Sequence, residues 1–160
     1  MNITFGGNPV TLIGNEIKVG DTAPDFKLVA NDLSEVTLKD TKGKRLFVVV
    51  PSLDTPICDM SAKRFNEEAA SLDASVYVIS VDLPFAQSRW CGASCSDKIV
   101  TLSDYKDRSF GENYGVYISE FGLLTRAIFV VDENNKVTYV EYCPEIKSEP
   151  NFEAALEALR

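Results

Sequence analysis

Four cysteines, at positions 58, 91, 95 and 143, are the residues best suited to chemistry in this chain, and histidine is absent. The absence of histidine excludes a Cys-His dyad, a Ser-His-Asp triad and any histidine metal site. Cysteines this sparse do not form the scaffold of a small secreted protein and are more typical of catalysis or metal binding. Zinc sites favour closely spaced cysteine pairs, and only Cys91 with Cys95 has such spacing, so we expect no metal site.

Cys58 has the most defined setting of the four. The apolar run 46–50 predicts a buried strand that Pro51 ends, and a helical pattern follows. With Thr55 as the N-cap and Pro56 in the first helical position, Cys58 is the third residue of the helix. Free backbone amides and the positive end of the helix dipole favour a thiolate there, and the Thr55 hydroxyl lies beside the sulfur.

A second interpretation of Cys58 stays open on this evidence. Its spacing also places it on the apolar face of the predicted helix with Phe65 and Leu72, and free cysteine is often a small buried hydrophobe. A nucleophilic cysteine without histidine needs a cation from elsewhere in the fold. Arg126, which precedes an apolar strand pattern, is the candidate for that cation.

The other patterns predict secondary structure in a β-α-β order. The expected elements are strands at 45–50, 76–81, 99–102, 127–131 and 136–142 and helices at 56–72, 82–91, 107–114 and 151–160. This order predicts an α/β thioredoxin-like fold, in which a central mixed β-sheet is flanked by helices. Two short runs at 3–5 and 10–13, separated by turn residues, predict an N-terminal β-hairpin extension of that sheet.

Composition restricts the class of protein. With 160 residues, 45% of them hydrophobic, we expect one domain covering 1–160. The formal net charge of −8 disfavours nucleic acid and anionic membrane surfaces as partners. The N-terminus lacks a basic stretch followed by an apolar run, and no segment approaches the ~18 apolar residues of a membrane span. We therefore expect a cytoplasmic protein without a membrane partner.

Two segments show a family resemblance. The pattern Pro51-x-x-x-Thr55-x-x-Cys58 matches the active-site signature of peroxiredoxins, and segment 82–93, DLPFAQSRWCGA, is similar to the hallmark of their thiol peroxidase subfamily. Shorter matches at 102–104, 126–127 and 149–156 extend the likeness over nearly the whole chain. The chain therefore resembles an atypical two-cysteine peroxiredoxin of the thiol peroxidase subfamily.

The resemblance implies a peroxidase that reduces hydrogen peroxide and organic hydroperoxides, takes electrons from thioredoxin, needs no cofactor and often works as a homodimer. By motif position, Cys58 is the peroxidatic cysteine and Thr55 its hydroxyl partner. Pro51 is implied to shield the pocket, and Arg126 to supply the activating guanidinium. Cys91 is implied to be the resolving cysteine, which forms an intramolecular disulfide with the sulfenic acid of Cys58.

The two remaining cysteines depart from the family pattern. The family usually continues Gly-Ala-Glu-Gly after the resolving cysteine, whereas this chain has Cys95 four residues after Cys91. Cys95 either competes as the resolving thiol, accepts the disulfide from Cys91, or is an incidental thiol, which is the simplest interpretation. Cys143 matches no family cysteine and is interpreted as incidental.

Two other functions were weighed against the peroxidase. A peroxide-sensing relay protein would use the same reactive cysteine but pass its oxidation to a partner protein. A general disulfide oxidoreductase normally has Cys-x-x-Cys at the helix start, and here Thr55 occupies the place of the first cysteine.

We expect Trp90 to lie in the core and Arg89 to be an exposed charge or to guide the reductase to the enzyme. Four apolar residues are expected to line a substrate entrance or a dimer interface: Phe85, Phe121, Leu123 and Leu124.

Overall fold

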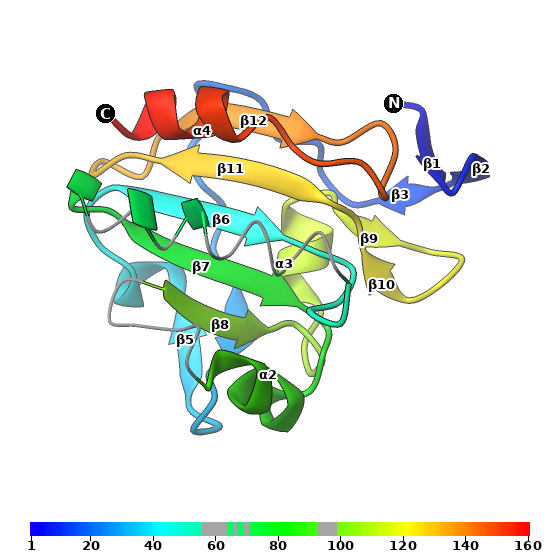
Figure 1. The fold of residues 1–160 in the computed structure, drawn as a ribbon, viewed down its shortest axis with the longest axis horizontal. Coiled ribbons are helices and arrows are strands. Elements are labelled where there is room, and N and C mark those ends of the chain that lie inside the picture. Colours follow the sequence, from blue (N-terminus) through cyan, green and yellow to red (C-terminus); the bar gives the residue numbers. More distant parts are fainter. Residues whose placement is uncertain (56–63, 66, 69–70, 93–98) are drawn as a thin grey trace.

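The computed structural model describes residues 1–55, 64–65, 67–68, 71–92 and 99–160 (Figure 1). Within these residues, a seven-stranded sheet has the order β12-β11-β6-β7-β8-β4-β5. Its strands are β4 (Lys27–Val29), β5 (Glu35–Thr37), β6 (Arg45–Val49), β7 (Ser75–Ser80), β8 (Ile99–Ser103), β11 (Ala127–Val131) and β12 (Val137–Tyr142). Strands β6, β7 and β8 are parallel, and the other pairs are antiparallel, so the sheet is mixed, as predicted.

Strand β6 lies in the middle of this sheet because its residues are apolar on both faces. All five residues are buried, and β6 pairs with β7 in parallel and with β11 antiparallel. Phe47 and Val49 face one side and Leu46 and Val48 the other, as the alternation of a strand requires. The predicted strand, buried on both faces, is confirmed.

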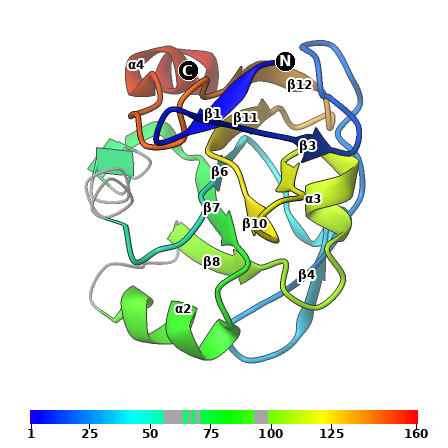
Figure 2. The same cartoon turned by 90° about the vertical axis from the view of Figure 1, so that its right-hand side faces the viewer.

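Helices cover both faces of the sheet. Figures 1 and 2 show α2 (Pro84–Cys91) and α4 (Phe152–Leu159) on one face and α3 (Ser109–Asn113) on the other. A short 3₁₀ helix, η1 (Leu38–Asp40), follows β5. Of the predicted helix at 56–72, the described residues 64–65, 67–68 and 71–72 are helical, and the rest lie outside the described residues.

Each face of the sheet has its own apolar core. On the α3 face, Phe110 and Tyr114 stack at 4.1 Å between ring centroids and pack against Phe47. On the opposite face, Phe65 packs edge-on against Phe152 at 5.1 Å. Burial of Phe65, as predicted for its helical face, fixes the described end of that helix against the sheet and α4.

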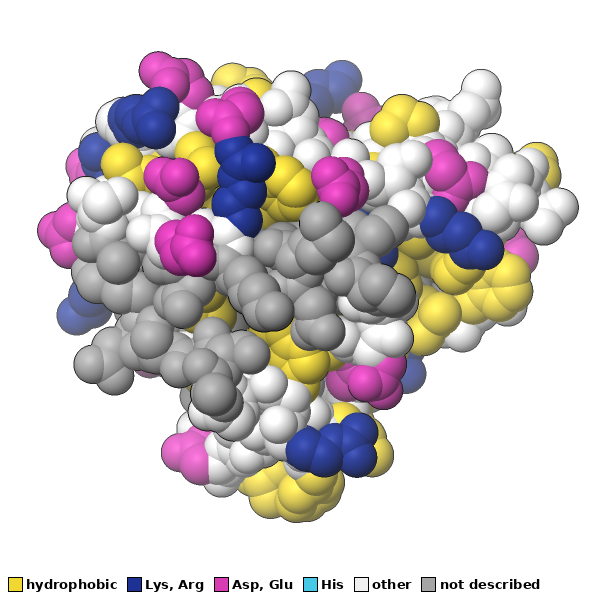
Figure 3. Space-filling model, viewed as in Figure 1, with side chains coloured by type: hydrophobic (Ala, Val, Ile, Leu, Met, Phe, Trp, Pro, Cys, Tyr) yellow, Lys and Arg dark blue, Asp and Glu magenta, His cyan; other side chains and the backbone are white. Residues whose placement is uncertain are grey.

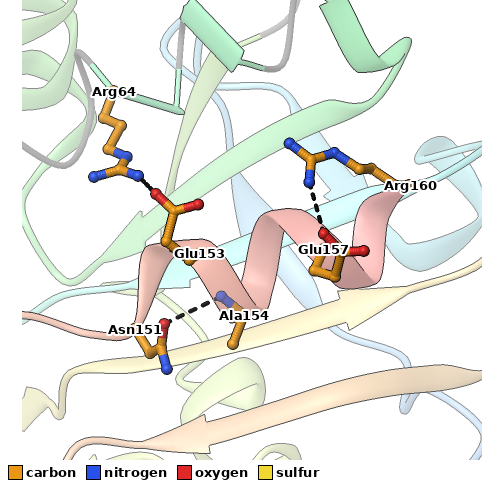
Figure 4. A network of polar contacts seen from close by, with 6 residues as sticks. All are labelled: Arg64, Asn151, Glu153, Ala154, Glu157 and Arg160. Atoms are coloured by element: carbon orange, nitrogen blue, oxygen red, sulfur yellow. Dashed lines mark hydrogen bonds and ion pairs between the residues drawn. The ribbon is translucent and has the colours of Figure 1, made fainter.

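Polar side chains stabilise both ends of helix α4 (Figure 4). Asn151 caps it, since its Oδ1 accepts a hydrogen bond from the Ala154 amide at 3.1 Å. Glu153 in the first turn forms an ion pair with Arg64, and Arg160 pairs with Glu157 at the C-terminus. The Arg64 contact joins α4 to the helical residues that follow the active-site segment.

An N-terminal hairpin is present, as predicted, but its second strand is Asn8–Val10 and not 10–13, and it does not extend the central sheet. Strands β1 (Ile3–Phe5) and β2 (Asn8–Val10) form a separate two-stranded sheet. Strand β3 (Leu12–Ile13) instead joins β9 (Tyr117–Ile118) and β10 (Leu123–Leu124) in a small third sheet. The physical reason is a separate apolar cluster of Ile3, Ile118 and Ile146, which holds the hairpin away from the central core.

Candidate active site

Three strand ends place two of the predicted site residues, Pro51 and Arg126, at the same edge of the central sheet. Pro51 follows β6 and is buried, and Asp82 follows the neighbouring strand β7. In the antiparallel register of β6 and β11, Ala127 pairs with Val49. Arg126, one residue earlier, therefore lies opposite residue 50, directly before Pro51. Proline and arginine, 75 positions apart in the sequence, meet at the carboxyl end of β6, where ligands of α/β sheets commonly bind.

The loop after β6 is held by one carboxylate. Asp82 accepts hydrogen bonds from the Leu53 amide at 2.8 Å and from the Ser52 hydroxyl at 2.9 Å. The Ser80 hydroxyl also donates to Asp82, at 2.8 Å. Leu53 is buried, at 4% exposure, so its amide would lack a partner without Asp82. This carboxylate fixes the loop that leads to Cys58.

Thr55 lies at the end of this loop and is half-buried. Its Oγ1 donates to the Ser52 carbonyl oxygen at 3.1 Å. Cys58 and Cys95 lie outside the described residues, so the expected contact of the Thr55 hydroxyl with the Cys58 sulfur stays a prediction.

Arg126 is a buried cation with a fixed direction. Its side chain is 3% exposed, and its Nε donates to the Ile146 carbonyl oxygen at 2.6 Å. Its own carbonyl oxygen accepts from the Cys143 amide at 3.0 Å. The segment after β12 thus orients the guanidinium at the strand end, where it is largely removed from water.

Cys91 is the last residue of α2 and is 8% exposed. The helix starts with Pro84 in its first turn and ends at Gly92, as the sequence predicts. The Cys91 sulfur is disulfide-bonded, and the other half of the bond lies outside the described residues. Cys91 can therefore form a disulfide, the property that a resolving cysteine needs.

Comparisons with known proteins agree with this arrangement. The family model described as Redoxin matches residues 18–156. The chain belongs to the Redoxin family. It is 58% identical to a thiol peroxidase of Bacillus subtilis over 160 residues, covering 99% of this chain and 96% of that protein. It is 55% identical to a thiol peroxidase of Clostridium acetobutylicum over 159 residues, covering 99% and 97%.

Solved structures of redoxins have the same fold. A peroxiredoxin-like protein from Aquifex aeolicus superposes with a TM-score of 0.90 at 41% identity, covering 99% of this chain and 95% of that one. A thiol peroxidase from Chromobacterium violaceum gives a TM-score of 0.89 at 25% identity with the same coverage. The thioredoxin-like fold and the family resemblance are confirmed. This redoxin is a peroxiredoxin-type enzyme that reduces peroxides at the expense of thiols.

Cys143 is a protonated thiol at neutral pH. It is 1% exposed, and burial, with the negative charge of Glu141, raises its pKa to about 12. Its sulfur lies 3.7 Å from Glu141 Oε2, to which it donates. A thiol held in this state is a poor nucleophile, as its predicted incidental role requires.

Apolar side chains near α2 are exposed. Leu83 and Phe85 are 52% and 69% exposed, and with Ala86 and Arg89 they line a shallow hollow of about 320 Å³. Figure 3 shows hydrophobic side chains gathered over α2. Trp90 is only half-buried, so its predicted core position is correct in part.

The other apolar candidates, Leu124 and Phe121, do not share one surface. Leu124 is fully buried in the core, so it lines neither an entrance nor an interface. The cause is its position on β10, which packs over α3. Phe121 is 57% exposed and packs edge-on against Phe5 of the hairpin at 5.6 Å.

Sequence reasoning gave no role to Asp82, although an acidic residue directly after a buried strand was a usable signal. It also missed Asn31 and Thr101, which contact the Cys91 sulfur.

Within the described part of the chain, no group of three or more histidine, cysteine or acidic side chains is placed to hold a metal ion. The described helices include none long and apolar enough to cross a membrane.

Proposed function

We propose that this enzyme is a thioredoxin-dependent two-cysteine peroxidase in which Cys58 is the peroxidatic and Cys91 the resolving cysteine. The observation that carries the proposal is the meeting of Pro51, Arg126 and the Asp82-held loop at the carboxyl end of β6. This loop leads directly to Cys58 in the sequence. The substrates are hydrogen peroxide and organic hydroperoxides.

In the first step, the Cys58 thiolate attacks one peroxide oxygen, and the O–O bond breaks. Cys58 becomes a sulfenic acid, and the other oxygen leaves with the bonding electron pair, then takes a proton to form water or an alcohol. The buried guanidinium of Arg126 and the Thr55 hydroxyl stabilise the negative charge as it develops on that oxygen. Because Arg126 is nearly removed from water, its charge acts there at low effective dielectric.

Pro51 shields the pocket through its buried position and its lack of a backbone N–H. It is buried at the strand end and has no N–H, so it covers one side of the pocket without adding a donor that would compete for the thiolate. Exclusion of water at this point strengthens the interactions of Arg126 with the departing oxygen.

In the second step, the Cys91 thiol condenses with the Cys58 sulfenic acid. The new S–S bond forms as the S–O bond breaks, and the hydroxide that leaves takes the thiol proton to become water. This step keeps Cys58 from the irreversible sulfinic acid. A thioredoxin dithiol then reduces the disulfide by exchange and is itself oxidised to a disulfide.

We further propose that the chain acts as a single domain over 1–160, in the cytoplasm, and as a homodimer. Sedimentation equilibrium tests the last point directly: a mass near 35 kDa supports a dimer, and the 17.7 kDa of one chain refutes it.

A coupled assay with thioredoxin, its reductase and NADPH tests the assignment. Cys58→Ser should abolish peroxide-dependent NADPH oxidation. Cys91→Ser should still consume one equivalent of peroxide but lose turnover with thioredoxin. Cys95→Ser and Cys143→Ser are matched controls that should retain activity. Full turnover in Cys91→Ser would refute its resolving role, and slow turnover in the wild type would favour a relay protein.

A further inference from the structure

Two side chains, one from β8 and one from the β4–β5 connection, contact the Cys91 sulfur at the end of α2. Its Sγ lies 3.3 Å from Thr101 Oγ1 on β8 and accepts a hydrogen bond from Asn31 Nδ2 at 3.5 Å. The Thr101 hydroxyl in turn donates to Asn31 Oδ1 at 2.9 Å. The three groups form a closed triangle in which Thr101 is fully buried.

The two partners of Cys91 in this triangle are held by the central sheet and by the β4–β5 connection. Thr101 pairs with Val78 in the parallel register of β7 and β8. Asn31 lies in the tight connection between β4 and β5, which is closed by backbone hydrogen bonds between Ala30 and Ser34 and between Leu33 and Ala30. Both partners of Cys91 are therefore held in place independently of α2.

The position of Cys91 would otherwise oppose a thiolate. Cys91 ends α2, where the helix dipole is negative, and it is 8% exposed. Both conditions disfavour a negative sulfur. Cys58, by contrast, is predicted at a helix start, where the dipole favours one. The two cysteines thus need different sources of stabilisation.

The triangle supplies the missing donors. The amide N–H of Asn31 already points to the sulfur, and the Thr101 hydroxyl can rotate its proton from Asn31 Oδ1 to a negative sulfur. Hydrogen bonds to the charged form of a group favour that form. Since Cys91 is disulfide-bonded while it makes these contacts, the donors are in place when that bond is broken.

We propose that Asn31 and Thr101 form a thiolate-stabilising site for Cys91. It acts when a reductant thiolate attacks the other sulfur of the disulfide: a new S–S bond forms to the reductant, the old one breaks, and its electron pair goes to Cys91 Sγ. A better stabilised thiolate leaves faster. The kinetic consequence rests on the proposed resolving role of Cys91, whereas the stabilisation itself does not.

The first experiment measures the thiolate alone. In a protein where Cys91 is the only cysteine, absorbance at 240 nm reports thiolate formation against pH. Thr101→Val keeps the shape but removes the hydroxyl, and Asn31→Leu keeps a similar size, removes the N–H and adds no charge. Each should move the titration midpoint upward by about one pH unit, the scale of one hydrogen bond to an ionised group, so that about tenfold less thiolate is present at pH 7.

Thr101→Ser, which keeps the hydroxyl, is the matched control and should titrate like the parent. An unchanged midpoint in folded Thr101→Val and Asn31→Leu, with native circular dichroism, would overturn the proposal. If a variant fails to fold, Asn31→Ala and Thr101→Ala give the same comparison by removing the donors with less strain on the backbone.

The second experiment measures reduction. In the otherwise wild-type enzyme, Thr101→Val and Asn31→Leu should slow reduction of the disulfide by dithiothreitol about three- to tenfold and leave the first reaction with peroxide unchanged. Equal reduction rates in both variants and the wild type would overturn the kinetic part. If Cys91→Ser turns over normally, the resolving role fails, but the titration result still decides whether the site exists.

Discussion

Removal of the Asp82 charge should loosen the loop that leads to Cys58. In Asp82→Asn, the amide oxygen can still accept from the Leu53 N–H and the Ser80 hydroxyl, and the new NH₂ group can donate to Ser52 Oγ. What is lost is the charge assistance. Hydrogen bonds to charged groups are worth ~1.5–3 kcal/mol and neutral ones ~0.5–1.5 kcal/mol.

Two acceptor bonds weakened by about 1 kcal/mol each would give a loss of about 2 kcal/mol in the free energy of unfolding. Because Asp82 is half-buried and water can reach the site, we expect about 1–2 kcal/mol. Asp82→Ala removes all three acceptor bonds and should cost about 3 kcal/mol. Since alignment errors of about 1 Å can cost a hundredfold in rate, the reaction with peroxide should slow about tenfold or more in Asp82→Ala.

Urea unfolding gives the stability change, and stopped-flow fluorescence gives the rate. Trp90, the single tryptophan of the chain, directly precedes Cys91, so we expect its fluorescence to change when Cys91 is oxidised. Asp54→Asn is the matched control, because Asp54 lies in the same loop, carries the same charge and is exposed. If Asp54→Asn and Asp82→Asn behave alike, or if Asp82→Ala reacts with peroxide at the wild-type rate, the carboxylate does not position this loop.

Three further predictions concern titratable groups. Burial raises the pKa of Asp104 to about 6 from an unfolded value near 3.8. The stability that Asp104 contributes is therefore complete below pH 4 and is lost as the pH rises through 6. Relative to Asp104→Asn, urea unfolding should show a loss of about 3 kcal/mol in the free energy of unfolding over this range. Hydrogen bonds from the Lys147 and Gly7 amides lower the pKa of Glu145 to about 2, so its anchoring of the hairpin is present above pH 4.5 and is lost toward pH 2. The Gly7 amide NMR shift should therefore titrate near pH 2, and not at all in Glu145→Gln. Cys143 should resist iodoacetamide at pH 8 in the native protein and react once urea unfolds it, as peptide mass spectrometry would show; alkylation of the folded protein would contradict its buried, protonated state.

The five longer strands of the central sheet could be predicted from the sequence because they contain apolar runs. Strand β6 was expected at 45–50 and observed at Arg45–Val49, and β7 was expected at 76–81 and observed at Ser75–Ser80. Short strands without such a signal were missed, among them β9 and β10 with two residues each. Strand β9 pairs with β3, over 100 residues earlier, and β10 pairs with β9, so no local pattern reveals this sheet.

The candidate site was predictable only where its residues act through local geometry. Pro51 directly follows an apolar run, so its place at a strand end could be predicted. The helix start expected at Thr55 and Cys58 stays a prediction, because residues 56–63 lie outside the described residues. The contact of Asn31 with Cys91 joins residues 60 positions apart, and it exists because the β4–β5 connection lies beside β8. Residues of this kind become visible only when the sheet order is known.

Segment 82–91 contacts both the loop that precedes Cys58 in the sequence and the surroundings of Cys91. Its first residue, Asp82, holds the loop before Cys58, and its last residue, Cys91, contacts Asn31 and Thr101. In the proposed mechanism, the peroxidatic thiolate is stabilised by the start of its helix and is therefore ready before peroxide arrives. The resolving thiol ends its helix and depends on two side-chain donors fixed to the sheet. This difference keeps Cys91 less reactive than Cys58 toward peroxide while it still leaves the disulfide readily, so the order of the two steps follows from where each cysteine lies on its helix.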